Sequence, residues 1–94
     1  MKIIWTPQAE LDRLEIFQFI ASENPAASIR MDQLFARFVE RLADFPQLGR
    51  PGMVEGTREI IPHRHYRLIY EILGDEIWVL ALLHTARQWP PMEA

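Results

Sequence analysis

The sequence predicts an α+β fold, with a short strand and two helices first and antiparallel strands after them. Apolar residues recur at helical spacing up to residue 45, and beyond residue 56 they gather in short runs typical of strands. Gly74-Asp75, a typical two-residue hairpin turn, separates the last two runs. We therefore expect one domain, residues 1–94, in which an antiparallel helical hairpin packs on a sheet formed by a three-stranded antiparallel meander.

Two helix starts carry the same signal, an N-capping side chain followed by proline. Lys2–Trp5 is predicted as a short first strand, and Thr6-Pro7 then begins a helix that runs to about Ser22. Asn24-Pro25 begins a second helix, which continues to Asp44 with apolar residues at i, i+4 and i+7. The short link between the two helices favours an antiparallel hairpin.

The stretch from Pro46 to Gly56 contains two prolines and three glycines and is predicted as a loop without regular structure. Three strands are expected after it, Thr57–Ile61, Tyr66–Leu73 and Glu76–His84. Pro62 is expected to end the first of them or to lie at a sheet edge.

The hairpin turn predicts the register of the last two strands. Leu73 should pair with Glu76, which places Tyr70 opposite Val79, Leu68 opposite Ala81 and Tyr66 opposite Leu83. These residues, with Ile72 and Ile77, form an apolar face that should carry the helices. The other face mixes large apolar side chains with basic ones, and comprises His65, Arg67, Ile69, Glu71, Trp78, Leu80, Leu82 and His84. No element of the chain is left to cover this second face, so we expect it to bind a macromolecule.

A cationic cluster is expected on the uncovered face. The predicted register sets His65 opposite His84 with Arg67 adjacent, and Arg58 and Arg87 could lie near. In a nuclease, such histidines would act as general acid or base and such arginines would neutralise a phosphate. We favour the simpler alternative, solvated polar residues or a docking site for an acidic partner, because most histidines are not catalytic.

Composition limits the other classes of function. The net charge of −3 argues weakly against tight, nonspecific nucleic-acid binding, and the absence of cysteine fits the cytoplasm. The longest apolar run, Ile77 to Leu83, is far too short to span a membrane. His63 and His65 lie two residues apart, but Arg64 and Arg67 would repel a cation, so we expect neither a metal nor another cofactor.

The chain resembles the RelE/ParE toxins, and the ParE branch in particular. The motifs that carry the resemblance run through the whole chain: Trp5-Thr6-Pro7 with Ala9, Asn24-Pro25 with Ala27, Pro46 with Gly49-Arg50-Pro51-Gly52, Gly56-Thr57-Arg58-Glu59, Tyr66 with Leu68-Ile69-Tyr70, and His84-Thr85-Ala86-Arg87-Gln88-Trp89-Pro90. The resemblance implies a toxin of a bacterial type II toxin–antitoxin system that acts in the cytoplasm. A cognate antitoxin would be its partner. The toxin could form a homodimer, or a heterotetramer together with the antitoxin.

The resemblance leaves three functions open. ParE-like toxins inhibit DNA gyrase, have no established nuclease chemistry, and would need no direct nucleic-acid contact. RelE-like toxins cut mRNA on the ribosome without a metal, and Arg58, His65, Arg67, His84 and Arg87 would then be the candidate catalytic residues. The third function is a non-toxic module that only binds antitoxin.

We favour a ParE-like gyrase inhibitor. The chain is acidic, its ending is ParE-like, and it lacks the terminal tyrosine typical of RelE-type nucleases. The candidate partner-binding residues are those of the uncovered face and the C-terminal segment, namely Trp78, Leu80, Leu82, His84, Arg87 and Trp89.

Overall fold

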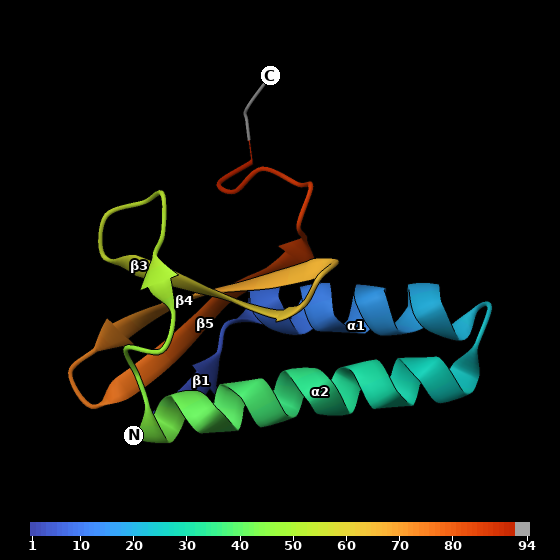
Figure 1. Cartoon of the computed structure of the whole chain (residues 1–94), viewed down its shortest axis with the longest axis horizontal. Helices are drawn as coiled ribbons and strands as arrows, with labels where there is room; N and C mark the ends of the chain where they lie inside the picture. The colour runs from blue at the N-terminus through green and yellow to red at the C-terminus, as the bar shows by residue number, and fades with distance from the viewer. Residues whose placement is uncertain (92–94) are drawn as a thin grey trace.

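A five-stranded sheet with both helices on one face forms the molecule (Figure 1), in a computed structural model that describes residues 1–91. The elements in chain order are β1 (Lys2–Trp5), α1 (Pro7–Ala21), α2 (Pro25–Asp44), β2 (Arg50–Pro51), β3 (Thr57–His63), β4 (Tyr66–Leu73) and β5 (Glu76–His84). The strand order is β1-β5-β4-β3-β2. β1 runs parallel to β5, and every other pair of neighbours is antiparallel. The predicted α+β class is confirmed. The sheet contains β1 and β2 in addition to the three strands of the meander.

Both helices begin where the capping signals predict. The Thr6 side chain accepts a hydrogen bond from the backbone N–H of Ala9 at 3.2 Å, and the Asn24 side chain accepts one from Ala27 at 3.1 Å. The prolines that follow occupy the first turn of each helix, where a missing N–H costs nothing. Along the part of the chain that the structure describes, neither helix is long and apolar enough to cross a membrane.

The segment predicted as a loop contains one short strand. β2 pairs with β3 through Arg50 opposite Glu59, so the prediction of no regular element there is wrong for these two residues. The Tyr70 hydroxyl donates to the carbonyl of Pro46 at 2.6 Å and accepts from the N–H of Gly49 at 2.9 Å. A Cβ at Gly49 would lie 2.7 Å from the Tyr70 ring, so only glycine allows the loop this close to the core.

A β-bulge in β5 changes the predicted register. Leu73 pairs with Glu76 and Tyr70 with Val79, as the hairpin turn predicts. The register then shifts by one residue, so that Leu68 lies opposite Leu82 and Tyr66 opposite His84. The predicted pairs Leu68–Ala81 and Tyr66–Leu83 are therefore wrong. One extra residue in a strand moves every later side chain to the other face.

The main core lies between the helices and the sheet. Phe35, Val39 and Leu42 of α2 pack there against strand residues that include Tyr70 and Val79, all at most 3 % exposed. Leu82 belongs to this core, whereas a second, smaller apolar cluster of Ile69, Ala81 and Leu83 lies on the opposite side of the sheet. We call that side, which no helix covers, the open face.

Candidate binding surface

The C-terminal segment covers part of the open face. Trp89 packs against the cluster of Ile69, Ala81 and Leu83, together with Leu80. The segment is fixed at its start by two hydrogen bonds from Thr85, whose N–H donates to the His65 carbonyl at 2.8 Å and whose hydroxyl donates to the Arg64 carbonyl at 3.1 Å. No helix or strand covers this face, as expected, but a segment without secondary structure covers part of it.

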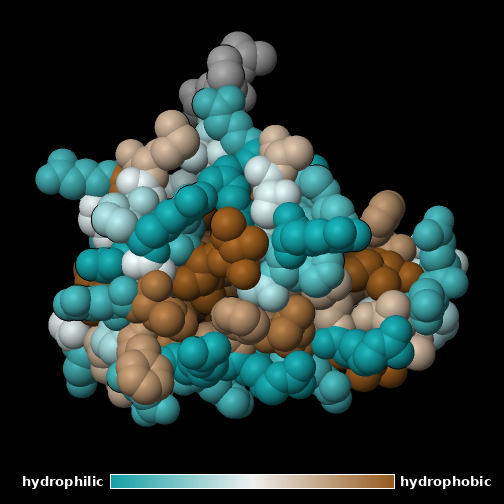
Figure 2. Space-filling model, in the orientation of Figure 1, coloured by the Kyte–Doolittle hydropathy of each residue, from teal (hydrophilic) through white to brown (hydrophobic). Residues whose placement is uncertain are grey.

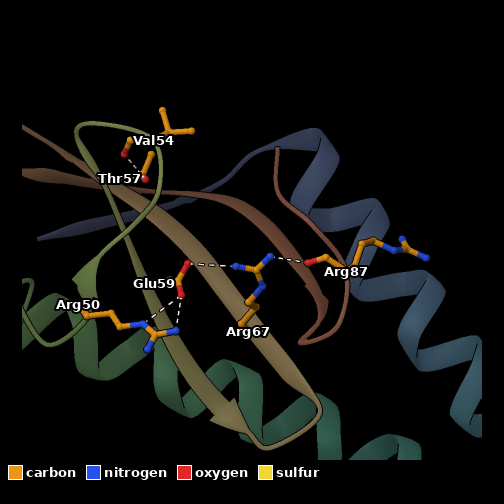
Figure 3. A network of polar contacts seen from close by, with 6 residues as sticks. All are labelled: Arg50, Val54, Thr57, Glu59, Arg67 and Arg87. Atoms are coloured by element: carbon orange, nitrogen blue, oxygen red, sulfur yellow. Dashed lines mark hydrogen bonds and ion pairs between the residues drawn. The ribbon is translucent and has the colours of Figure 1, made fainter. Parts of the chain in front are cut away.

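Glu59 is the centre of a polar network on the open face (Figure 3). Glu59 as a whole is 6 % exposed. Its carboxylate forms ion pairs with Arg50 at 2.7 Å and with Arg67 at 3.2 Å. Arg67 also donates a hydrogen bond to the carbonyl oxygen of Arg87 in the C-terminal segment. Glu59 has no clear signal in the sequence, because its strand also contains the polar residues Thr57, Arg58 and His63.

The arginines expected beside the histidines lie elsewhere or are already paired. Arg67 is fixed by Glu59, and its buried Nε lacks a hydrogen-bond partner among the residues described. Arg58 donates to the carbonyl of Gly49 at 2.7 Å, from a strand position opposite the core residue Tyr70. Arg58 therefore holds the 46–49 loop and does not join the expected cluster.

Three histidines do gather at the turn between β3 and β4. The ring centroids of His63 and His65 are 5.3 Å apart, and those of His65 and His84 are 5.8 Å apart with the rings stacked. His65 is in the turn and faces His84 across the shifted register, so the two are neighbours although they are not the predicted strand pair. Partial desolvation, and then the nearby charges of Arg64, His63 and His84, lower the pKa of His65. A lowered pKa favours the neutral imidazole at pH 7.

Backbone contacts select the tautomer of two of these histidines. The N–H of His65 donates to Nδ1 of His63 at 3.2 Å, and the N–H of Ala86 donates to Nδ1 of His84 at 3.1 Å. A neutral ring that accepts at Nδ1 carries its proton on Nε2, so the neutral form of His63 or His84 would have an N–H donor at Nε2. In residues 1–91, no group of three histidine, aspartate or glutamate side chains is arranged to hold a metal ion.

The bulge also moves two predicted partner-binding residues. Leu82 is 2 % exposed in the main core, and His84 lines a recess against α1, so both were wrongly assigned to the open face. Trp78 and Leu80 precede the shift, are half-buried, and keep their predicted face. Arg87 is exposed, and Trp89 is half-buried over the smaller cluster.

A recess of about 460 Å³ lies between α1 and the end of β5. Asp12, Glu15 and Phe19 form its helical wall, and His84 and Arg87 lie on the other side. Figure 2 shows a different apolar band, which runs between α2 and the sheet. Phe38, Leu48, Ile60 and Ile61 line a shallower recess of about 330 Å³ there, together with Arg41, Arg50 and Glu59.

Comparison with known proteins identifies the family. The model of the ParE toxin of type II toxin–antitoxin systems, parDE, matches residues 3–89. The chain belongs to this ParE toxin family. It is 36 % identical over 91 residues to the putative toxin Y4kP of Sinorhizobium fredii (strain NBRC 101917 / NGR234), covering 95 % of this chain and 93 % of that protein. It is 26 % identical to toxin RelE2 of Caulobacter vibrioides (strain ATCC 19089 / CIP 103742 / CB 15), covering 92 % of this chain and 97 % of that protein.

Solved structures share the fold. The chromosomal ParDE toxin–antitoxin system from P. aeruginosa contains a chain that superposes with a TM-score of 0.80 at 24 % identity, over 89 % of this chain and 95 % of that one. A YoeB/ParE toxin from Agrobacterium tumefaciens superposes with a TM-score of 0.67 at 17 % identity, over 89 % of this chain and 98 % of that one. The chain is thus a type II toxin of the RelE/ParE superfamily, a family that implies an antitoxin partner.

Proposed function

We propose that this ParE-family toxin inhibits DNA gyrase in the bacterial cytoplasm by binding it, without chemistry of its own, and that a cognate antitoxin neutralises it. The observation that supports the proposal is that Arg67, the arginine on the open face, is already paired. Arg67 is bound to Glu59 on one side and to the Arg87 carbonyl on the other, so its charge is already neutralised within the chain.

Nuclease chemistry would need these groups to be free. A scissile phosphate requires cations that are not already paired and a proton donor or acceptor within hydrogen-bond reach. Arg58 donates to Gly49, and Arg67 is held by an almost fully buried carboxylate. Breaking such a pair to bind a phosphate would leave the buried Glu59 carboxylate with the exposed Arg50 as its remaining ion-pair partner, which is costly. A toxin that acts through surface contacts with its target avoids this cost.

A supercoiling assay with purified gyrase tests the proposal. We expect toxin at micromolar concentration to reduce supercoiling and to increase cleaved DNA, and equimolar antitoxin to reverse both effects. Arg87, which is exposed, and Trp89, which is half-buried, are the proposed gyrase contacts to substitute first, because both belong to the C-terminal segment. Gyrase that keeps full activity with a toxin that still arrests growth would reject the proposal.

A RelE-like ribonuclease is the second candidate, and the stacked pair of His65 and His84 supports it. Their rings are exposed, and His84 offers an Nε2–H donor to a phosphate. In a translating extract, this function would give mRNA cleavage that is lost in His84→Ala. Intact mRNA with wild-type toxin would reject it. Normal growth after expression without antitoxin would instead support a non-toxic antitoxin-binding module.

A further inference from the structure

The loop at the tip of the β2–β3 hairpin presents the most exposed apolar side chain in residues 1–91. β2 ends at Pro51 and β3 begins at Thr57, and the loop between them projects from the sheet on the side away from α2 (Figure 1). Met53 in this loop is 79 % exposed, and its neighbour Val54 is 38 % exposed. Single exposed apolar residues are common on protein surfaces, so their meaning depends on whether the loop that presents them is ordered.

Hydrogen bonds close this loop. The N–H of Gly52 donates to the Thr57 carbonyl at 2.8 Å, and the N–H of Thr57 donates to the Val54 carbonyl at 3.0 Å. The Thr57 hydroxyl donates to the same Val54 carbonyl at 2.6 Å (Figure 3). Thr57 is 7 % exposed, so water competes little for its hydroxyl. Because the Val54 carbonyl accepts twice from one residue, the tip is fixed relative to β3.

The sequence and the base of the hairpin favour the same shape. Gly56 has a φ of 88°, in the left-handed region that residues with a Cβ rarely adopt. At the base, β2 pairs with Arg58 and Glu59 of β3, and the Arg50–Glu59 ion pair joins the same two strands. A partner can therefore bind the tip without first ordering it, and so avoids much of the entropic cost of binding a loop.

The side chains at the tip match an apolar recess on another protein. Methionine is unbranched and polarisable, so it adapts to the shape of such a recess. Nucleic acid is a poorer occupant, because Arg50 is already paired with Glu59, and Glu55 is exposed in the same loop. A lipid surface is poorer as well, since stable binding to it needs a much larger apolar area or a basic patch.

We propose that the tip of the β2–β3 hairpin is a contact with gyrase, in which Met53 and Val54 enter an apolar recess on the enzyme. The inference rests on the proposed inhibition of gyrase, and it names a second contact site besides the C-terminal segment. β2 is the strand at one edge of the sheet, whereas β5, which leads into the C-terminal segment, lies next to the strand at the other edge. The two sites therefore belong to different parts of the toxin, and each can be substituted separately.

Binding of purified toxin to immobilised gyrase, measured by surface plasmon resonance, tests the site with matched variants. We expect Met53→Asp to weaken binding about tenfold, because it places a charge in an apolar contact. Met53→Leu keeps an apolar side chain of similar volume and should bind within about twofold of wild type. Leu14→Asp introduces the same charge at another exposed apolar residue (51 %), on α1, and should also stay within about twofold.

A further variant separates the order of the loop from its side chains. Thr57→Val keeps the volume of the side chain but removes the hydroxyl that donates to Val54. We expect binding to be about threefold weaker although Met53 is intact, since a loosened tip must be ordered on binding. Hydrogen exchange of the wild-type toxin locates the contact without any substitution, and the amides of residues 53–56 should exchange more slowly with gyrase than without it.

The outcomes distinguish this inference from the proposed function. Equal affinities of Met53→Asp and Leu14→Asp for gyrase, with unchanged exchange at the tip, would overturn the inference and leave inhibition of gyrase intact. A wild-type toxin that does not bind gyrase would reject the proposed function, and the occupant of the tip with it. Met53→Asp that binds gyrase normally but loses its antitoxin, or loses a toxin dimer, would also overturn the inference by assigning the tip to that partner.

Discussion

At the scale of single residues, Glu59 organises the open face. It joins Arg50 from the loop side to Arg67 in β4, and through Arg67 it reaches the C-terminal segment (Figure 3). The two arginines differ in environment, since the side chain of Arg50 is 66 % exposed and that of Arg67 is 13 % exposed. Charge pairs far from water depend much more on both partners being present than exposed pairs do.

Removing Glu59 should therefore cost far more than removing Arg50. We expect Glu59→Ala to lower the free energy of unfolding by about 3 kcal/mol, because it leaves the Arg67 guanidinium buried without a counter-charge. Arg50→Ala should lower it by less than about 1 kcal/mol. Urea denaturation of both variants measures the difference, and equal losses would show that Arg67 finds another partner.

At the scale of elements, Thr6 connects the first helix to the sheet. Its hydroxyl accepts the N–H of Ala9 and donates to the Val79 carbonyl at 2.8 Å, just before the bulge in β5. The Thr6 side chain thus caps α1 and also binds β5. The register of β5 decides which of its side chains lie on each face of the sheet. Asn24 caps α2 in the same way, but in an exposed position.

Substitution of Thr6 should separate these two roles. We expect Thr6→Ala to reduce the free energy of unfolding by about 2 kcal/mol, since it loses a cap and a hydrogen bond to the strand. Asn24→Ala loses only a cap and should cost about 1 kcal/mol. Thr6→Ser keeps the hydroxyl and is the control, with most of the stability retained. A loss for Thr6→Ala no larger than for Asn24→Ala would argue against the contribution of the Val79 contact.

At the scale of the whole molecule, a sheet that should have one bare face has that face partly covered by its own C-terminal segment. Trp89 shields Ile69, Ala81 and Leu83, and the Arg87 carbonyl accepts from Arg67. The covering depends on one aromatic side chain and a few hydrogen bonds, and it encloses an apolar cluster much smaller than the main core.

Loss of Trp89 should expose that cluster without unfolding the core. We expect Trp89→Ala to lower the free energy of unfolding by about 2 kcal/mol, less than for a fully buried tryptophan, and to increase binding of a hydrophobic dye to the folded protein. The adjacent exposed residue provides the control, Gln88→Ala, which should change neither quantity. Unchanged dye binding in Trp89→Ala would mean that other residues cover the cluster.

The sequence alone determined the features that depend on neighbouring residues. Capping side chains followed by proline located both helix starts, and Gly74-Asp75 gave the hairpin and the pairing next to it, because these signals act within a few residues. The family resemblance, carried by short motifs along the whole chain, is confirmed by the ParE toxin match over residues 3–89.

Only the tertiary structure decided which side chains share a face at the end of β5. The bulge lies where β5 contacts β4 on one edge and Thr6 on the other, and Thr6 is distant in sequence. It moved Leu82 into the core and His84 to the recess beside α1. The pairing of Glu59 with Arg67 and the contact of Asp12 with Leu82 likewise join residues from separate elements, so only the folded arrangement brings them together.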